Sequence, residues 1–175
     1  MVPAEPQSGG EEIVRALFLL AIAAVCRAQS LPLFVIERSL NANVVHYDAR
    51  LAPDGKLDIR QPVIAYWVMA AEDGRRQDLT LLERLKAYGF SAIPAASGES
   101  CRIVLVAQKK REIQIVLDHD AARAEMTIGG RLAYLHRMFV STHKSLGLPV
   151  PTYVELFGSD VSTGSDCYEK VLPDK

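Results

Sequence analysis

The chain has 175 residues, of which 49% are hydrophobic and 23% charged, and its formal net charge is -1. These values are typical of a soluble domain with a hydrophobic core, and they exclude a disordered chain, a disulfide-dense miniprotein and a protein with several membrane spans. The near-neutral charge also argues against a dedicated nucleic-acid-binding protein, which usually carries a clustered basic excess.

An unbroken apolar run, Ala16–Val25, lies near the start of the chain and is too short to span a bilayer, which needs about 20 residues. Arg15 precedes the run, and Cys26-Arg27-Ala28 follows it in the small-x-Ala pattern of a cleavage site. This pattern predicts that residues 1–28 are a signal peptide and that the mature chain is exported to the periplasm or the extracellular space. A buried core helix and a lipidated Cys26 are the alternatives.

The residues before this run are acidic, whereas the leading region of a signal peptide is normally positive. The true start is therefore predicted to lie further along the chain, near Val14. Cleavage after Ala28 removes Arg15, Arg27 and three glutamates, which leaves 18 basic and 18 acidic residues in the mature chain.

Two cysteines remain in that mature chain, Cys101 and Cys167, and an oxidising compartment permits one disulfide bond between them. Such a bond would close a loop of about 66 residues and stabilise the fold by roughly 4 kcal/mol. Two unpaired thiols are the alternative, because sequence does not show whether the Cα atoms come within bonding distance.

The first half of the mature region is predicted to contain four strands and one short helix. Strands are expected at Leu33–Ser39, Asn43–Leu51, Lys56–Arg60 and Pro62–Met69, with an Asp54-Gly55 hairpin turn between the second and third. The helix begins after Thr80, which forms a capping box with Glu83. Leu79, Leu82 and Leu85 are expected to form its buried face.

The second half is predicted to be strands alone, with a two-residue hairpin loop at Gly129-Gly130. The expected strands are Cys101–Gln108, Glu112–Asp118, Arg123–Ile128, Arg131–Val140, Thr152–Phe157 and Asp166–Leu172. Short strands joined by tight turns indicate a mainly β fold built as an antiparallel meander.

A meander of this length must protect its edge strands, and closure into a barrel does so. We therefore expect residues 29–175 to form a single β-rich domain that closes, or nearly closes, into a lipocalin-like β-barrel with one short covering helix. A rolled sheet packed on that helix is the alternative.

The richest polar stretch follows the first predicted strand, from Glu37 to Asn43. Strand alternation places Phe34, Ile36 and Arg38 on one face and Glu37 on the other. A charged side chain therefore points inward whichever face lies toward the core. The five donors of an arginine can bind an anionic ligand or pin a loop. An arginine that satisfies backbone carbonyls of the following turn is the alternative.

The same stretch carries a resemblance. The pattern R-S-x-N-x-N at Arg38–Asn43, the Tyr66-Trp67 strand and the segment LTLLERLKAYGF at Leu79–Phe90 together resemble a family of exported bacterial proteins known as a domain of unknown function, DUF4833. The resemblance covers most of Leu33–Cys167. It implies that the motif positions of the family correspond here to Arg38, Ser39, Asn41 and Asn43. It implies no activity.

Motifs for catalysis and cofactor binding are weak. Ser141-Thr142-His143-Lys144 matches the S-x-x-K of acyl-serine enzymes but follows a strand, and the partner motifs are absent from the sequence. Asp118-His119-Asp120 is interpreted as a solvated turn, since the chain has no H-E-x-x-H or paired C-x-x-C. We expect no metal, no cofactor, no nucleic-acid partner and no transmembrane segment in the mature chain.

The expected function is therefore non-enzymatic: an exported barrel that binds a small or lipidic ligand or a cell-envelope partner, as barrels of about eight strands can hold one small ligand. The candidate pocket residues are Arg38, Tyr66, Trp67 and His136, in addition to Ser39, Asn41 and Asn43 from the motif. A hydrolase that uses Glu37, Arg38, Asn41 and His46 is one alternative, and a purely structural envelope protein is another.

Overall fold

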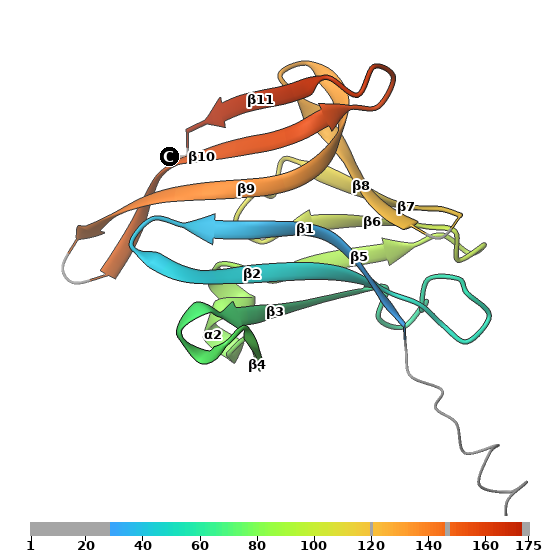
Figure 1. The fold of residues 1–175 in the computed structure, drawn as a ribbon, viewed down its shortest axis with the longest axis horizontal. Coiled ribbons are helices and arrows are strands. Elements are labelled where there is room, and N and C mark those ends of the chain that lie inside the picture. Colours follow the sequence, from blue (N-terminus) through green and yellow to red (C-terminus); the bar gives the residue numbers. More distant parts are fainter. Residues whose placement is uncertain (1–28, 120, 146–147, 173–175) are drawn as a thin grey trace, which may run out of the picture.

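The computed structural model describes residues 29–119, 121–145 and 148–172, which form one curled sheet with a single short α-helix (Figure 1). The strands are β1 (Ser30–Arg38), β2 (Asn41–Arg50), β3 (Val63–Met69), β4 (Arg75–Asp78), β5 (Phe90–Pro94), β6 (Ser100–Leu105), β7 (Glu112–Asp118), β8 (Ala121–Ile128), β9 (Arg131–Ser145), β10 (Leu148–Asp160) and β11 (Asp166–Val171). A 3₁₀ turn, η1 (Ala70–Glu72), and the helix α2 (Leu81–Lys86) lie between β3 and β5. The predicted signal peptide, residues 1–28, lies outside the described residues.

Strand β9 joins two leaves of the sheet. Its first residues pair antiparallel with β8, from Glu125↔Tyr134 to Ile128↔Arg131, and its middle residues pair parallel with β1, from Val35↔Arg137 to Arg38↔Val140. The first leaf is β1–β4 and the second leaf is β5–β8. The hairpin of β10 and β11 continues along the other edge of β9 (Figure 1).

The sheet curls into a half-barrel that stays open (Figure 1). The mainly β prediction is confirmed, but the expected barrel closure is not found: within the described residues, β4 and β5, which end the two leaves, do not pair with each other. A physical reason lies in β4, whose four residues Arg75–Asp78 are all exposed and mostly charged. Short, charged edge strands resist further pairing.

Two other predictions about the strands were wrong. The meander is not purely antiparallel, because β1 pairs parallel with β9. The expected strand Lys56–Arg60 is absent, and the described part of that loop makes one isolated β-bridge, between Leu51 and Leu57. Asp58 explains the absence, since its carboxylate accepts a hydrogen bond from the Arg60 backbone N–H at 2.9 Å and so favours a turn.

A bend at Gly158 lets β10 follow β9 where β9 passes from one leaf to the other. Phe157 pairs with Arg137 and Gly158 with Leu135, so His136 is the extra residue of a β-bulge. A Cβ atom on Gly158 would lie 2.3 Å from the carbonyl oxygen of Tyr134. Only glycine fits this close approach of two backbones without a shift.

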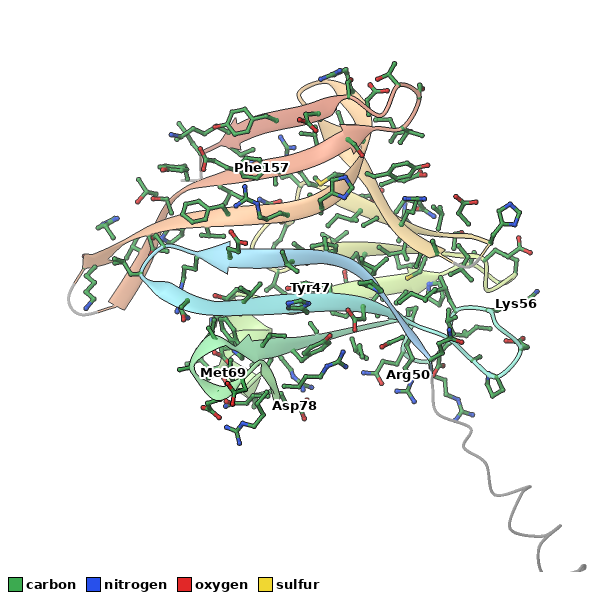
Figure 2. The ribbon with its side chains drawn as sticks, viewed as in Figure 1. Tyr47, Arg50, Lys56, Met69, Asp78 and Phe157 are labelled. Atoms are coloured by element: carbon green, nitrogen blue, oxygen red, sulfur yellow. The ribbon has the colours of Figure 1, made fainter. Side chains whose placement is uncertain are left out.

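The hydrophobic core lies between the two leaves, and aromatic rings fill its centre. Tyr47, midway along β2 (Figure 2), is fully buried, and its ring stacks on Phe34 with centroids 4.5 Å apart. Its hydroxyl donates to the backbone carbonyl of Tyr88 at 2.6 Å, which fixes the segment after α2 against the sheet.

The short helix α2 has the predicted capping box and lacks the predicted buried face. Thr80 Oγ1 accepts from the Glu83 backbone N–H at 3.3 Å, and the Glu83 carboxylate accepts from the Thr80 backbone N–H at 2.8 Å. Leu82 and Leu85 are 68% and 62% exposed, and of the three predicted leucines only Leu79 is buried. Six residues are too few to lay an apolar stripe on the core.

Candidate functional site

A cavity of about 600 Å³ lies between the two leaves, beside the C-terminal end of β1. Its walls come from segments far apart in sequence: the end of β1, the segment after α2, the loop between β6 and β7, and strands β9 to β11. The lining residues are Ile36, Arg38, Lys86, Ala87, Tyr88, Leu105, Ala107, Gln108, Lys110, Arg111, Met138, Val140, Thr142, Pro151, Val154, Val171 and Leu172.

Most of the cavity wall is aliphatic. Ile36, Leu105 and Met138 are buried members of the hydrophobic core, and Val140 and Val154 are half-buried side chains that pack against it. A surface of this kind favours an apolar ligand, because apolar area removed from water stabilises a complex by about 25 cal/mol per Å².

The polar part of the wall is basic. Arg38, Lys86, Lys110 and Arg111 line the cavity, and no aspartate or glutamate is among the described lining residues. Lys86 and Lys110 are exposed, so they lie where the cavity meets solvent. The cavity therefore presents positive charge beside an apolar wall.

Arg111 has its own counter-ion. Its guanidinium donates to both carboxylate oxygens of Glu169 on β11, with Nη1 3.0 Å from Oε2. Glu169 Oε2 also accepts from the Gly129 backbone N–H at 2.9 Å. The hydrogen bond from Arg111 is the main reason that the pKa of Glu169 lies below its usual value. Arg111 is thus neutralised within the chain.

Arg38 has no such counter-ion. Its side chain is half-buried, and among the described residues it makes no hydrogen bond and lies within ion-pair distance of no carboxylate. Its charge is felt by the neighbouring phenol: burial raises the pKa of Tyr88, and the positive charge of Arg38 acts in the opposite direction. The predicted alternation of β1 is present, since Phe34 and Ile36 on the same face are buried.

The rest of the R-S-x-N-x-N motif holds the backbone around Arg38. Ser39 Oγ accepts from the Thr142 backbone N–H at 2.8 Å and so ties the end of β1 to β9. Asn41 Oδ1 accepts from the Asn43 backbone N–H at 3.0 Å, which shapes the turn into β2. Asn43 Oδ1 accepts from the backbone N–H of Ala70, also at 3.0 Å. Of the four motif residues, Arg38 alone lines the cavity.

The aromatic candidates lie beside the cavity rather than in its wall. Trp67 is buried and donates through Nε1 to Glu83 at 3.1 Å, with its ring edge against Tyr88, so it anchors α2. Tyr66 points to the other face of β3 and donates to the buried carboxylate of Asp48 at 2.8 Å. Burial, and next the hydrogen bond to Asp48, raises the pKa of Tyr66 to about 12.

His136 lies on the surface and does not line the cavity. Its Nε2 atom is 2.9 Å from Ser159 Oγ, and its side chain is exposed at the bulge of β9. That bulge interrupts the alternation of β9 at His136.

The four residues of the hydrolase hypothesis are not brought together. Glu37 forms an ion pair with Arg137 at 2.9 Å on the face opposite Arg38, and Asn41 lies in the turn. His46 stacks on Tyr66 at 5.8 Å, and burial is the main reason that its pKa is lowered. No nucleophile, base and orienting group converge among them.

A second hollow, of about 870 Å³, lies between the edge of β3 and β4 and the start of β5. The charges around it have partners within the chain. Arg50 Nε lies 3.4 Å from the carboxylate of Asp58, Arg76 lies 3.7 Å from Asp48, and Arg84 donates to the carbonyl of Leu79 at 3.1 Å. This hollow is larger than the cavity, but its cations are already neutralised or hydrogen-bonded.

A model of the family described as a domain of unknown function (DUF4833) matches residues 34–170. The chain belongs to this family. Searches of the curated proteins and of the solved structures give no match. The matched range runs from β1 into β11 and so includes Arg38, Glu169 and nearly all of the cavity wall of this DUF4833 domain.

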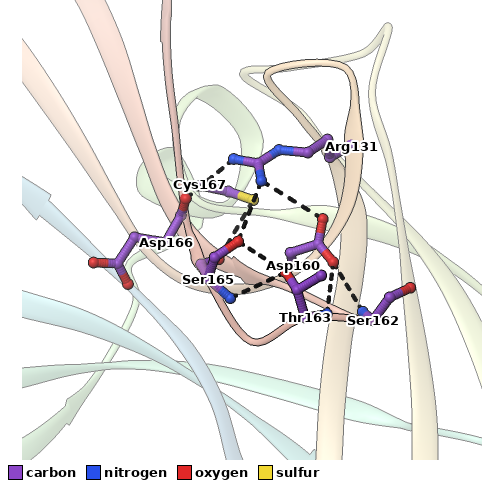
Figure 3. Close-up of polar contacts among 7 residues, drawn as sticks. All are labelled: Arg131, Asp160, Ser162, Thr163, Ser165, Asp166 and Cys167. Atoms are coloured by element: carbon purple, nitrogen blue, oxygen red, sulfur yellow. Dashed lines mark hydrogen bonds and ion pairs between the residues drawn. The ribbon is translucent and has the colours of Figure 1, made fainter.

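The polar turn between β10 and β11 of the DUF4833 domain is structural. Asp160 Oδ1 accepts from the backbone N–H groups of Ser162 and Thr163, each at 2.9 Å, and these bonds are the main reason that its pKa is lowered (Figure 3). Arg131 bridges this turn to the backbone carbonyl of Asp166 at 3.1 Å. These polar groups hold the hairpin turn in place.

The cysteines Cys101 and Cys167 are two free, buried thiols, on β6 and β11 respectively. Within the described ranges, no group of three or more histidine, cysteine, aspartate or glutamate side chains is placed to hold a metal ion. Over the same ranges, no helix has both the length and the apolar character needed to cross a membrane.

Several cavity residues were missed by sequence reasoning. Tyr88, Gln108, Lys86 and Arg111 are all in the wall. No local signal marks them, because the loop between β6 and β7 meets the end of β1 only through the curl of the sheet. Among these residues, Gln108 has a side-chain oxygen, Oε1, that is buried without a hydrogen-bond partner among the described residues.

Proposed function

We propose that this DUF4833 domain binds a small lipidic molecule in the cavity between its two leaves. The observation that carries the proposal is the cavity itself, with a volume of about 600 Å³ and a mostly aliphatic wall. Ligand sites in proteins typically have volumes of about 300–1,000 Å³ and are largely apolar with a few polar groups that orient the ligand.

The unfilled volume supports this proposal because protein interiors are normally close-packed, with few voids larger than a water molecule. The same interior is filled by Phe34 and Tyr47 a short distance along the strands, so the fold is able to pack large side chains. The cavity wall instead carries small or aliphatic side chains such as Ala87, Val140 and Val154. A ligand in this space would restore the contacts that the wall lacks.

The predicted signal peptide at residues 1–28 supports export of this binding domain to the periplasm or the extracellular space. Fractionation of cells that express the full chain tests the localisation of the protein, and the intact mass of the recovered protein tests cleavage after Ala28. We expect an exported form that begins at Gln29. A cytosolic protein that retains residues 16–28 would contradict export and leave the cavity proposal intact.

The binding proposal is tested with N-phenyl-1-naphthylamine, an uncharged dye whose fluorescence rises in apolar surroundings. We expect saturable binding of one dye per chain. Val154→Phe places a ring in the cavity and should weaken dye binding by at least about tenfold, which corresponds to about 1.4 kcal/mol.

Val150→Phe is the matched control, because Val150 lies on the same strand and is outside the cavity wall. It should bind the dye as the unmodified protein does. The absence of saturable binding would contradict the proposal and favour a purely structural role. Equal losses in both variants would show that the dye binds elsewhere.

A further inference from the structure

The cavity holds a positive charge that the described chain does not neutralise. Arg38 is half-buried at the cavity wall, with neither a carboxylate within ion-pair distance nor a hydrogen bond among the described residues. A charge removed from bulk water is costly unless it is paired or hydrogen-bonded. The guanidinium therefore gains most from an anion that enters the cavity.

Arg111 is a second arginine of this wall, and its role is structural. In the same wall, Arg111 is held by both oxygens of Glu169, and it joins the loop before β7 to β11. Arg38 has no equivalent partner among the described residues, although Ser39 holds its backbone against β9 and so fixes where its side chain begins. The position of Arg38 is fixed, and no described side chain neutralises its charge.

Two further features of the wall agree with an anionic guest. No acidic side chain is among the described lining residues, so none of these residues repels a negative group. Gln108 Oε1 is buried without a hydrogen-bond partner among the described residues, which is a second polar atom left for a ligand or a bound water. The aliphatic wall beside these groups suits a hydrocarbon chain.

We propose that the ligand is a single-chain amphiphile with an anionic oxygen head group, whose head is bound by the Arg38 guanidinium and whose hydrocarbon chain lies along Ile36, Met138 and Val154. This inference rests on the proposed function of the same cavity. Carboxylate and phosphate head groups share the required chemistry, because arginine donates two parallel hydrogen bonds to either.

The test measures how well dodecanoate, dodecyl phosphate and dodecan-1-ol displace N-phenyl-1-naphthylamine from the full chain, below the concentrations at which these compounds form micelles. We expect both anions to displace the dye at roughly tenfold lower concentration than the alcohol, since hydrogen bonds between charged groups are stronger than those to a neutral hydroxyl. The stronger of the two anions distinguishes a fatty-acid source from a phosphate-headed one.

Arg38→Gln should abolish the preference for the anions, so that dodecanoate and dodecyl phosphate displace the dye no better than dodecan-1-ol does. Arg60→Gln is the matched control: Arg60 lies in the loop between β2 and β3, outside the cavity, and the variant should retain the full preference.

The outcomes separate the two proposals. If the unmodified protein binds the dye but shows no preference for anions, the head-group inference is wrong and the apolar cavity stands. An anion preference that persists in Arg38→Gln would assign the head group to another residue and overturn the inference as well. If the dye does not bind, the proposed function fails and the inference fails with it. If Arg38→Gln does not fold, the preference of the unmodified protein still tests the anionic head group, and Arg38→Lys, which lacks the two parallel donors, should show a weaker preference if Arg38 binds that group.

Discussion

The inner face of β1 passes through two different environments within a few residues. At Phe34 the interior is filled, because that ring stacks on Tyr47, whose hydroxyl is bonded to the Tyr88 carbonyl. At Arg38, on the same face of the strand, the interior is a cavity, and the positive charge in its wall has no partner among the described residues. One strand thus borders both a filled region and a cavity.

This difference separates stability from binding. The filled region stabilises the fold through buried area and close contacts, so damage there lowers the free energy of unfolding. The unfilled space contributes no such packing, and half-buried wall residues such as Arg38 and Val154 can be changed with a larger effect on ligand affinity than on stability. The comparison between the two regions leads to four predictions.

Tyr47→Ala should have the largest effect, because it removes a fully buried ring from the filled region. Large-to-small changes of this kind cost about 3–5 kcal/mol, and urea unfolding should show a loss of this size. Tyr47→Phe keeps the ring and removes only the hydroxyl, so it should cost about 1 kcal/mol. Similar losses for both variants would mean that the ring packing is not the main contribution.

Gly158→Ala should be the next most damaging change, because its Cβ would lie 2.3 Å from the Tyr134 carbonyl oxygen and 2.9 Å from Ile128 Cδ1. We expect a loss of about 3 kcal/mol in the free energy of unfolding, since the backbones at the bend must move apart. Gly164→Ala is the contrast, because no atom lies within 4 Å of the added methyl group. Its only cost is backbone strain, since alanine rarely adopts the φ of +70° found at this position. Equal costs would show that crowding at the bend is unimportant.

Glu169→Gln sharpens the contrast between the two cavity arginines, because it removes the counter-ion of Arg111. Both side chains are about a quarter exposed, 28% for Arg111 and 25% for Glu169, so we expect a loss of only about 1 kcal/mol at neutral pH.

The loss in Glu169→Gln should depend on pH. The pKa of Glu169 is lowered in the folded protein, so its charge stabilises the fold above its unfolded pKa of about 4.3, and this stabilisation disappears as the pH falls through the folded pKa. The difference in unfolding free energy between the unmodified protein and the variant should therefore be largest above about pH 5 and shrink toward pH 3. A difference that grows on acidification would contradict this role of Glu169.

Thr80→Ala should have the smallest effect, because the capping box stabilises a six-residue helix that lies largely on the surface. N-cap replacements by alanine cost about 1 kcal/mol in favourable cases, and we expect less than that here. Dye binding should change little, since Trp67 and Tyr88 still hold the segment after α2 against the sheet. A loss comparable to that of Tyr47→Ala would show that α2 is needed for the fold.

Local patterns predicted the local structure of this domain well. The alternation through Phe34, Ile36 and Arg38 predicted that the three side chains share a face, and the Thr80–Glu83 pair predicted the capping box. The Gly129-Gly130 loop joins β8 and β9 as expected, because both glycines have positive φ, +58° and +81°.

Features that depend on distant contacts were not predictable. The parallel pairing of β1 with β9 joins residues about a hundred positions apart, as Ser39 and Thr142 do, and no local pattern encodes it. The edge strand β4 was missed because its sequence, RRQD, has no apolar alternation. The cavity was not visible for the same reason, since its wall is assembled by the curl of the whole sheet.

The most direct test of the account is a crystal structure of the protein with 12-bromododecanoate, in which the anomalous signal of bromine locates the end of the hydrocarbon chain. We predict a carboxylate within hydrogen-bonding distance of the Arg38 guanidinium and a bromine signal inside the cavity beside Met138 and Val154. A cavity filled by the protein's own side chains, or a bromine signal only on the outer face of the sheet, would contradict the central claim.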